Sequence, residues 1–355
     1  MIFNRTGNLP VRLFRIIAAV LLTAVIIIPQ TGCGGKEPVS GSEFCLDTSC
    51  EITIYDMEGM SEDKAAGIID QAFAEIREYE NMLSRTVEGS DVYRINHADG
   101  KSTEVSAETL DVIRTGLLMA ELSGGKFDIT VGALTDLWKF TSDNPSVPED
   151  QEIRKALETV GYENITMKGN EVGLSDSETR IDLGGVAKGY IADKTGEYME
   201  AQGVTKAIIN LGGNITAIGE KEEDTPWTIG IERPYSDRSE IVGSIKVSDK
   251  TVVTSGIYER QFVEDGVRYH HVLDPQTGYP AETDLEAVTI TAVKGNSGFC
   301  DSLSTACLIL GKEKAHRLVL KLQDENPQME IEAAFIDKND NIAQTDGMNL
   351  ELVEK

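Results

Sequence analysis

The most regular pattern in the chain is a stripe of apolar residues between positions 65 and 79. Its members recur every three or four positions, which predicts one face of a helix that packs on a core. They are Ala65, Ile68, Ile69, Ala72, Phe73, Ile76 and Tyr79. A second helix is predicted between Ser106, which can act as an N-cap, and the Gly124-Gly125 pair, which can end it.

Short apolar runs typical of strands occur once near the start and repeatedly in the second half of the chain. Strands are predicted at 51–56, 207–210, 227–231, 241–247, 251–254, 260–264, 267–272, 287–292 and 331–336, and further helices at 152–160, 299–310 and 312–322. Because strands and helices alternate only partly, we predict an α+β fold with mixed or antiparallel sheets and flanking helices.

The stretch from Asp182 to Tyr190 combines a turn with a charged helix start. It predicts a strand end, a turn at Gly184-Gly185 and a helix that stops near Gly203. Unpaired N–H groups at such a helix start attract anions such as phosphate, and Lys188 adds a positive charge where the helix dipole disfavours one. The combination indicates an anion site; the alternative is a tight turn with an exposed lysine.

The first 33 residues have the pattern of a bacterial export signal. Three arginines precede an apolar run at 16–28, and Thr31-Gly32-Cys33 follows, similar to the cleavage site of a lipoprotein, although Gln30 replaces the usual aliphatic residue. We expect a lipoprotein-type signal peptide over 1–32, a lipid on Cys33, a flexible tether over 33–43 and one domain over 44–355. An ordinary signal peptide or an uncleaved anchor is the alternative, and each of these puts the protein outside the cytoplasm.

The composition narrows the possible ligands. The formal net charge is −27 and no basic patch interrupts it, which argues against a nucleic-acid partner. An anionic substrate therefore needs a local cation or helix dipole. The chain also lacks a Gly-x-Ser-x-Gly elbow, a His-Glu-x-x-His pair, a P-loop lysine and a Cys-x-x-Cys pair, so serine hydrolases, zinc peptidases and P-loop nucleotidases lose support.

Four of the five cysteines are expected to be small buried thiols. Cys300 and Cys307 are about 10 Å apart along a predicted helix, which is too far for a disulfide. Cys45 and Cys50 can pair only across a turn.

Three further segments carry candidate chemistry. Asp301 and Thr305 lie on one face of a predicted helix, and their oxygens suit Mg²⁺ or Ca²⁺; helix capping by Asp301 is the alternative. The hydroxyl-rich segment 254–260, which follows a strand, can hold phosphate. His270 and His271 precede a turn-rich segment, either as part of a site or as part of a simple hairpin. Adjacent strand residues face opposite sides, so only one of the two can face a site.

Six blocks in order resemble the bacterial FAD:protein FMN transferase family, formerly called thiamine-biosynthesis lipoproteins. The blocks lie at 127–132, 182–190, 210–214, 254–260, 270–280 and 301–305, and the resemblance extends over about residues 45–310. Any one block can arise by chance, whereas six in this order and spacing are specific. The resemblance implies a flavin-transferase-like fold and an enzyme.

The resemblance also implies a role for each block. The side chains of Asp301 and Thr305 and the backbone carbonyl of Gly185 would hold one Mg²⁺, and His271 would be the catalytic base. The positions that match the FAD site are Leu46, Thr86, Lys126, Phe127, Asp128, Asp182, Lys188, Thr254 and Leu273.

The implied reaction moves FMN from FAD to a Thr or Ser hydroxyl of an extracytoplasmic protein, such as a redox-pump subunit or a flavin-binding domain, and releases AMP. Mg²⁺ beside the pyrophosphate would polarise its phosphorus–oxygen bonds.

The chain departs from the family in having Leu46-Asp47-Thr48 for Met-Gly-Thr, and Thr86 where an aromatic ring is common. Loss of the ring would either loosen FAD binding or favour water as acceptor. A metal-dependent FAD pyrophosphatase is the alternative enzyme. A flavin-binding lipoprotein without turnover is the alternative outside catalysis.

Overall fold

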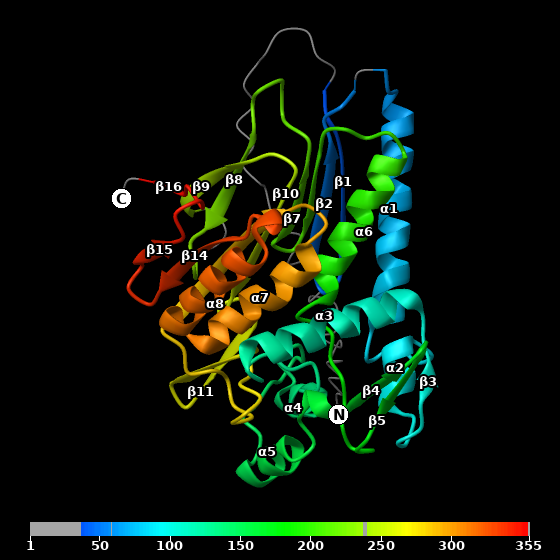
Figure 1. Cartoon of the computed structure of the whole chain (residues 1–355), viewed down its shortest axis with the longest axis vertical. Coiled ribbons are helices and arrows are strands. Elements are labelled where there is room, and N and C mark those ends of the chain that lie inside the picture. The colour runs from blue at the N-terminus through cyan, green and yellow to red at the C-terminus, as the bar shows by residue number, and fades with distance from the viewer. Residues whose placement is uncertain (1–36, 58, 237–239, 354–355) are drawn as a thin grey trace, which may run out of the picture. The chain divides into compact units, whose positions relative to one another are not determined.

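An eight-stranded antiparallel sheet forms the centre of the computed structural model, which describes residues 37–57, 59–236 and 240–353 (Figure 1). All of these residues belong to one compact unit. The strands, in their order across the sheet, are β1 (Val39–Cys45), β2 (Thr48–Ile54), β6 (Ala207–Leu211), β7 (Asn214–Ile218), β10 (Lys250–Gly256), β13 (Leu285–Val293), β14 (Glu332–Asp337) and β15 (Ile342–Gln344). The predicted α+β class with antiparallel sheets is confirmed.

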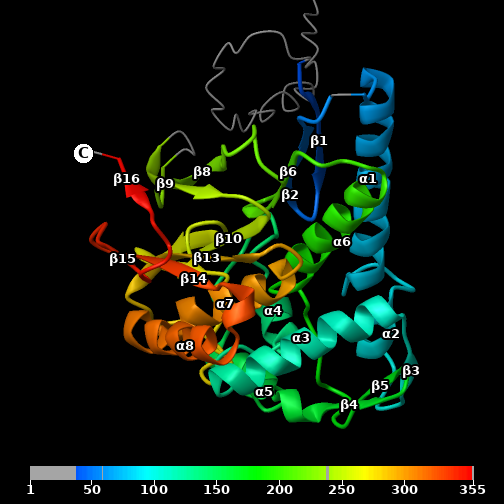
Figure 2. The same cartoon turned by 45° about the horizontal axis from the view of Figure 1, so that its top comes forward.

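Four helices pack on one face of this sheet (Figure 2). They are α1 (Glu62–Leu83) over β1 and β2, α6 (Ala187–Ala201) over β6 and β7, α7 (Ser297–Leu310) over β10 and β13, and α8 (Lys312–Glu325) over β14. Successive strand residues alternate between the two faces. Val253 of β10 therefore joins the core beneath the helices, whereas Val252 joins a second core on the other face.

That second core lies beneath a small sheet of three strands, β16 (Glu351–Leu352), β9 (Ile241–Val247) and β8 (Trp227–Glu232). Trp227, Ile229 and Ile245 from the small sheet pack with Val252 and Ala287 from the large one. The large sheet is thus covered on both faces, so a site has to lie at the ends of its strands or in the loops that follow them.

The remaining elements build the part of the unit below the ends of α1 and α6 in Figure 1. They are α2 (Asp91–Asn96), β3 (Thr103–Glu104), α3 (Ala107–Ser123), α4 (Gly132–Trp138), α5 (Asp150–Leu157), η1 (Tyr162–Asn164), β4 (Ile165–Lys168) and β5 (Glu171–Leu174), together with the hairpin β11 (Gln261–Glu264) and β12 (Val267–His270). The short η2 (Pro327–Met329) instead follows α8 and packs on α8 and β13. Trp138 of α4 packs on Phe262 and Tyr269 of the hairpin. This aromatic contact fixes the hairpin that leads into His271.

The predicted caps of the second helix are confirmed. Ser106 Oγ accepts a hydrogen bond from the backbone N–H of Thr109 at 3.1 Å, and Gly124 ends α3 in the left-handed conformation with φ 66°. The apolar stripe from Ala65 to Tyr79 lies within α1 and faces the sheet. The sequence pattern thus placed both helices correctly.

The predicted flexible tether is wrong for residues 39–43, because they belong to β1. This strand pairs with β2 over its whole length, from Val39 opposite Ile54 to Cys45 opposite Thr48. It is an edge strand rich in small and polar residues, so its sequence resembles a linker. A Cβ atom at Gly41 would lie 2.5 Å from Ile69 of α1, so the glycine is needed for close packing. Residues 33–36 lie outside the described residues.

Two predicted strand boundaries also need correction. No strand leads into Gly184-Gly185; a single bridge between Val131 and Arg180 takes its place. The strand predicted at 267–272 ends at His270, so His271 lies just beyond β12.

Cys45, Cys50, Cys300 and Cys307 are all buried, free thiols, as expected. Within the described ranges, no helix is long and apolar enough to span a membrane. The predicted signal segment, including Cys33, lies outside those ranges.

Candidate active site

The Gly184-Gly185 turn and the start of α6 form the first part of the site. Gly184 and Gly185 lie in a turn and α6 begins at Ala187, so the predicted turn and helix are confirmed. Lys188 Nζ lies 3.4 Å from the backbone oxygen of Gly184 and 3.8 Å from Asp301 Oδ1. The lysine near the positive end of the helix therefore has a carboxylate of the same chain beside it.

Asp301 lies in the second turn of α7 and is only 2 % exposed. Its Oδ2 accepts a hydrogen bond from the backbone N–H of Gly189 at 3.0 Å. The capping alternative is thus partly right, because Asp301 caps a helix, but that helix is α6 rather than its own. The second carboxylate oxygen faces Lys188.

Thr305 lies one turn further along α7, on the same face as Asp301. A Cβ atom at Gly185 would lie 3.9 Å from Thr305 Oγ1 and 2.9 Å from the ring of Phe127. Ser255 Oγ of β10 is 3.4 Å from Thr305 Oγ1. The fold therefore gathers the three proposed metal ligands from one helix and one turn: Asp301 and Thr305 from α7, and Gly185 from the turn before α6.

The chemistry of these donors fits Mg²⁺. Among the residues that the structure describes, no group of three or more His, Cys, Asp or Glu side chains is arranged to hold a metal. The site instead offers one carboxylate, one hydroxyl and one backbone carbonyl, all oxygen donors. Mg²⁺ commonly binds one or two carboxylates and completes its shell with water and substrate phosphates, so a sparse oxygen site suits it.

His271 is held by Arg260, which lies just before β11, on the opposite side of the hairpin. Its backbone N–H donates to the backbone oxygen of Arg260 at 3.0 Å, and its ring Nδ1 lies 3.2 Å from the same oxygen. Burial lowers the pKa of His271 to about 3, and the positive charges of Arg260 and Lys188 act in the same direction. The ring is therefore neutral at physiological pH and close enough to Lys188 to sense its charge.

His270 occupies different surroundings, as the strand alternation predicts. It is 7 % exposed, and its Nδ1 has no hydrogen-bond partner among the described residues. Burial lowers the pKa of His270 to about 4, and Lys338 rather than Lys188 contributes the nearby positive charge. Of the two histidines, only His271 has its pKa lowered by the charge of Lys188 in α6.

Two predicted FAD contacts, Asp182 and Lys126, are half-buried charges that form ion pairs. Asp182 Oδ1 accepts from the backbone N–H of Gly184 at 2.9 Å, and its Oδ2 lies 3.2 Å from Arg85 Nε. Lys126 Nζ lies 2.7 Å from Asp274 Oδ2. The Arg85–Asp182 pair joins the segment after α1 to the residues just before the Gly-Gly turn. The Lys126–Asp274 pair joins the loop after α3 to the segment that follows His271.

The side chain of Asp128 serves its own loop. Its Oδ1 accepts from the backbone and hydroxyl of Thr130 at 2.7 and 2.6 Å, and its Oδ2 accepts from the backbone N–H of Tyr162 at 2.9 Å. Burial raises the pKa of Asp128, and these bonds oppose the rise. A direct contact between this carboxylate and FAD is therefore disfavoured, and its role is to hold the loop that carries Phe127.

The other predicted flavin positions are more scattered. Leu46 lies in the β1–β2 turn with φ 54°, and its N–H donates to Glu80 at 2.8 Å. Thr254 lies in β10, and its hydroxyl is 2.9 Å from that of Thr289. Thr86 is exposed next to Arg85, whereas Leu273 is 7 % exposed within the aromatic cluster around Trp138.

Sequence reasoning missed Arg85, Ser255 and Arg260 as parts of this region. Arg260 lies 3.7 Å from Asp47 and supplies the carbonyl that holds His271. Arg260 and Ser255 fall inside the block 254–260, so the block pointed to them without assigning a role. Arg85 follows the end of α1 and carries no periodic signal.

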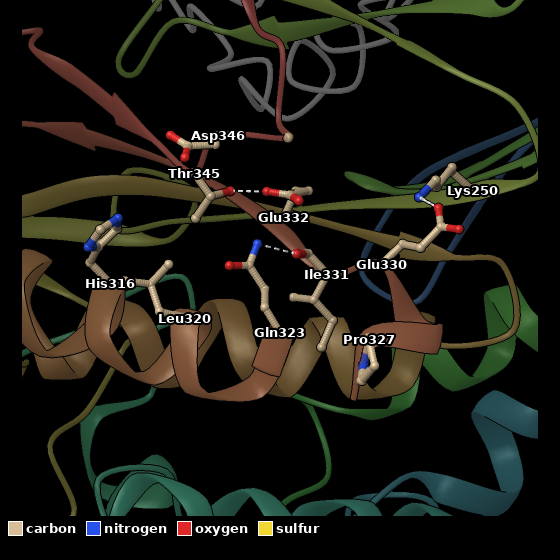
Figure 3. Close-up of a pocket in the computed structure, with 11 residues that line it drawn as sticks. Lys250, His316, Leu320, Gln323, Pro327, Glu330, Ile331, Glu332, Thr345 and Asp346 are labelled. Atoms are coloured by element: carbon tan, nitrogen blue, oxygen red, sulfur yellow. Dashed lines mark hydrogen bonds and ion pairs between the residues drawn. The ribbon is translucent and has the colours of Figure 1, made fainter. Parts of the chain in front are cut away.

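A cavity of about 630 Å³ lies elsewhere, between α8, the start of β14 and residues 345–347, which follow β15 (Figure 3). His316, Gln323, Glu332 and Thr345 are among its lining residues. None of the predicted site residues lines it, so it is not the predicted flavin site.

Comparison with known proteins agrees with this arrangement. Residues 46–330 match the ApbE family. The chain is 34 % identical over 306 residues to the FAD:protein FMN transferase of Treponema pallidum, with 81 % of this chain and 83 % of that protein covered. The crystal structure of the ApbE protein from Thermotoga maritima matches with a TM-score of 0.78 at 33 % identity, covering 90 % of this chain and 100 % of the other.

The flavin transferase ApbE from Vibrio cholerae matches with a TM-score of 0.75 at 27 % identity, covering 87 % of this chain and 96 % of the other. The fold, the order of the sequence blocks and these matches agree over most of the chain. The chain therefore belongs to the ApbE family, the family of the FAD:protein FMN transferases.

Proposed function

We propose that this enzyme transfers FMN from FAD to a Thr or Ser hydroxyl of an extracytoplasmic protein and releases AMP. The main observation behind the proposal is that the neutral His271, Lys188 and the oxygen donors of Asp301 and Thr305 lie near the Gly184-Gly185 turn. Lys188 links them, since it lies 3.8 Å from Asp301 and its charge reaches His271. The names of the relatives support the same reaction.

In the proposed reaction the acceptor hydroxyl attacks the FMN-side phosphorus of the pyrophosphate. A new phosphorus–oxygen ester bond forms, the bond to the AMP oxygen breaks, and AMP leaves with the electron pair. His271 accepts the hydroxyl proton at Nε2, because Nδ1 faces the carbonyl oxygen of Arg260. Lys188 and Arg260 offset the negative charge of the phosphates.

Asp301, Thr305 and the carbonyl of Gly185 would hold the Mg²⁺ of this site. When bound, Mg²⁺ polarises the phosphorus–oxygen bonds and offsets developing charge. The chain's own contribution is to hold the carboxylate in place: the Gly189 N–H fixes one oxygen of Asp301 and directs the other toward Lys188.

FAD hydrolysis to FMN and AMP is the second candidate function, and the exposure of Thr86 favours it. Thr86 follows the end of α1 and its side chain is exposed, at a position where the family resemblance implies an aromatic ring. Water would then take the place of the acceptor hydroxyl in the same site.

We also propose that the protein acts outside the cytoplasm, anchored to the bacterial membrane by a lipid on Cys33. The export-signal pattern of the first 33 residues supports this proposal. Replacing Cys33 with alanine should release the protein from membranes or leave the precursor uncleaved. An unmodified Cys33 in the mature membrane-bound protein would overturn it.

Measuring AMP release from FAD and Mg²⁺ with and without an acceptor separates these functions. Transfer predicts that AMP release depends on the acceptor, hydrolysis predicts the same release without one, and simple flavin binding predicts none. The acceptor used would be a redox-pump subunit or a flavin-binding domain with a candidate threonine.

A further inference from the structure

The helices α6 and α7 run antiparallel and touch at three levels, each separated by four residues. Four residues are about one helical turn, so the contacts lie along one line. The pairs are Asp193 with Ser297, Gly189 with Asp301, and Gly185 with Thr305. The two levels nearest the Gly-Gly turn carry the proposed metal ligands, whereas the level at Asp193 lies outside the site described above.

Each helix is capped by an aspartate of the other. Neither Asn296, the N-cap of α7, nor Val186, the N-cap of α6, makes a side-chain capping bond. Instead Asp193 accepts from the backbone N–H groups of Ser297 at 3.0 Å and Gly298 at 3.1 Å. Asp301 returns the contact by accepting from Gly189. The two caps hold the helix starts together and satisfy N–H groups that would otherwise be unpaired.

The contact leaves little room for sliding. A Cβ atom at Gly189 would overlap the backbone oxygen of Ser297, and one at Gly298 would lie 3.2 Å from the backbone nitrogen of Tyr190. The backbones of the two helices therefore meet directly. A change in the hydrogen bonds at Asp193 would be transmitted along this rigid contact to Asp301, which lies four residues along α7 from Ser297.

We propose that Asp193 is a positioning residue that sets the register of α7 on α6 and thereby places Asp301 and Thr305 against Gly185 and Lys188. The inference rests on the proposed function for the meaning of the metal site, but the register itself is a property of the fold. Asp193 touches none of the proposed ligands directly and would act through the start of α7.

The test compares Asp193→Asn with Glu197→Gln as a matched control. Asparagine has the same shape but only one acceptor oxygen, so one of the two N–H groups at the start of α7 faces an amide N–H₂ instead. Glu197 lies one turn along the same helix, is exposed, and pairs only with Lys194 among the ion pairs seen. Its replacement alters charge to the same extent without touching α7.

The first measurement is the hydrogen-exchange rate of the Gly189 amide, which needs neither metal nor turnover. Asp193→Asn should speed this exchange at least tenfold, although Asp193 makes no bond to that amide, and Glu197→Gln should leave it unchanged. Unchanged exchange in Asp193→Asn would overturn the proposal, even if the melting temperature falls.

The second measurement is Mg²⁺ binding by calorimetry in the presence of FAD. Asp193→Asn should weaken Mg²⁺ binding about 10- to 100-fold, the usual effect of losing a group that orients a metal ligand. Altered exchange with unchanged Mg²⁺ affinity would overturn the positioning role. Absence of Mg²⁺ binding in the parent protein would instead refute the proposed metal site, and the exchange rates would then decide the register alone.

Discussion

The Nδ1 atom of His271 lies 3.2 Å from the backbone oxygen of Arg260, which also accepts the His271 backbone N–H at 3.0 Å. A carbonyl oxygen only accepts hydrogen bonds, so this contact is a hydrogen bond only if Nδ1 carries the proton. Nε2 then has a free lone pair. The contact thus prepares the ring to accept a proton, which is the role proposed for His271.

Replacing His271 with alanine should slow FMN transfer about 10²–10⁴-fold, the usual contribution of a placed general base. FAD binding, measured by flavin fluorescence, should stay within about twofold, since the donors around Gly185 remain. His270→Ala serves as the control. It should lower the melting temperature, because His270 is buried, but keep most of the transfer rate. Full activity in His271→Ala would show that another group is the base.

The rate should depend only weakly on acidity above pH 5. An ordinary histidine with a pKa near 6.5 would lose about thirtyfold of its neutral form between pH 8 and pH 5. Burial and the nearby positive charges lower the pKa of His271 to about 3, so its neutral form persists. The measurement is kcat/KM for FAD at saturating acceptor from pH 5 to pH 8. An inflection near 6.5 that disappears in His271→Ala would contradict this assignment.

Asp301→Asn should abolish tight Mg²⁺ binding with FAD while the fold survives. The amide oxygen can still accept from Gly189, but the only negative side chain among the proposed ligands is lost. Asp128→Asn is the contrasting variant, because that carboxylate holds its own loop through three hydrogen bonds. It should lower the melting temperature and leave the Mg²⁺ affinity within about threefold. The reverse pattern would show that Asp128 rather than Asp301 belongs to the metal site.

Gly189→Ala should destabilise the protein by about 1–3 kcal/mol or more, because the new methyl group overlaps the backbone of α7. Gly196→Ala on the same helix provides the control. Its Cβ atom would lie 3.5 Å from Thr216, an ordinary contact, so it should be neutral or slightly stabilising, as alanine is in helices. Urea unfolding of both variants checks the prediction. Equal stability of the two variants would mean that the helices can separate at Gly189 at little cost.

The sequence predicted those features that depend on local pattern. The apolar stripe of α1, the caps of α3 at Ser106 and Gly124, and the Gly-Gly turn before α6 were placed correctly. Strand β1 was missed because an edge strand of small and polar residues has the composition of a linker. The strand expected before Gly184 did not form: Arg180 makes a single bridge to Val131, and the next residue, Ile181, bonds to the side chain of Asn96 instead of to a strand.

Tertiary partners could not be predicted from local pattern. The i, i+4 spacing of Asp301 and Thr305 gave their shared face, but nothing in it showed that Asp301 caps α6. Likewise, nothing in the local pattern showed that the oxygens of Asp128 bond to Thr130 and Tyr162. Such contacts join segments distant in sequence, and only the folded chain shows them.

The most direct test of the account is the intact mass of an acceptor domain after incubation with FAD, Mg²⁺ and this enzyme. One sample carries the candidate threonine, and a matched sample has that threonine replaced by valine. The account predicts a gain of one FMN, as a phosphoester, on the threonine form alone, with an equal amount of AMP released and about 10²–10⁴-fold slower labelling by His271→Ala. An unmodified acceptor accompanied by equal amounts of free FMN and AMP would contradict it and establish hydrolysis instead.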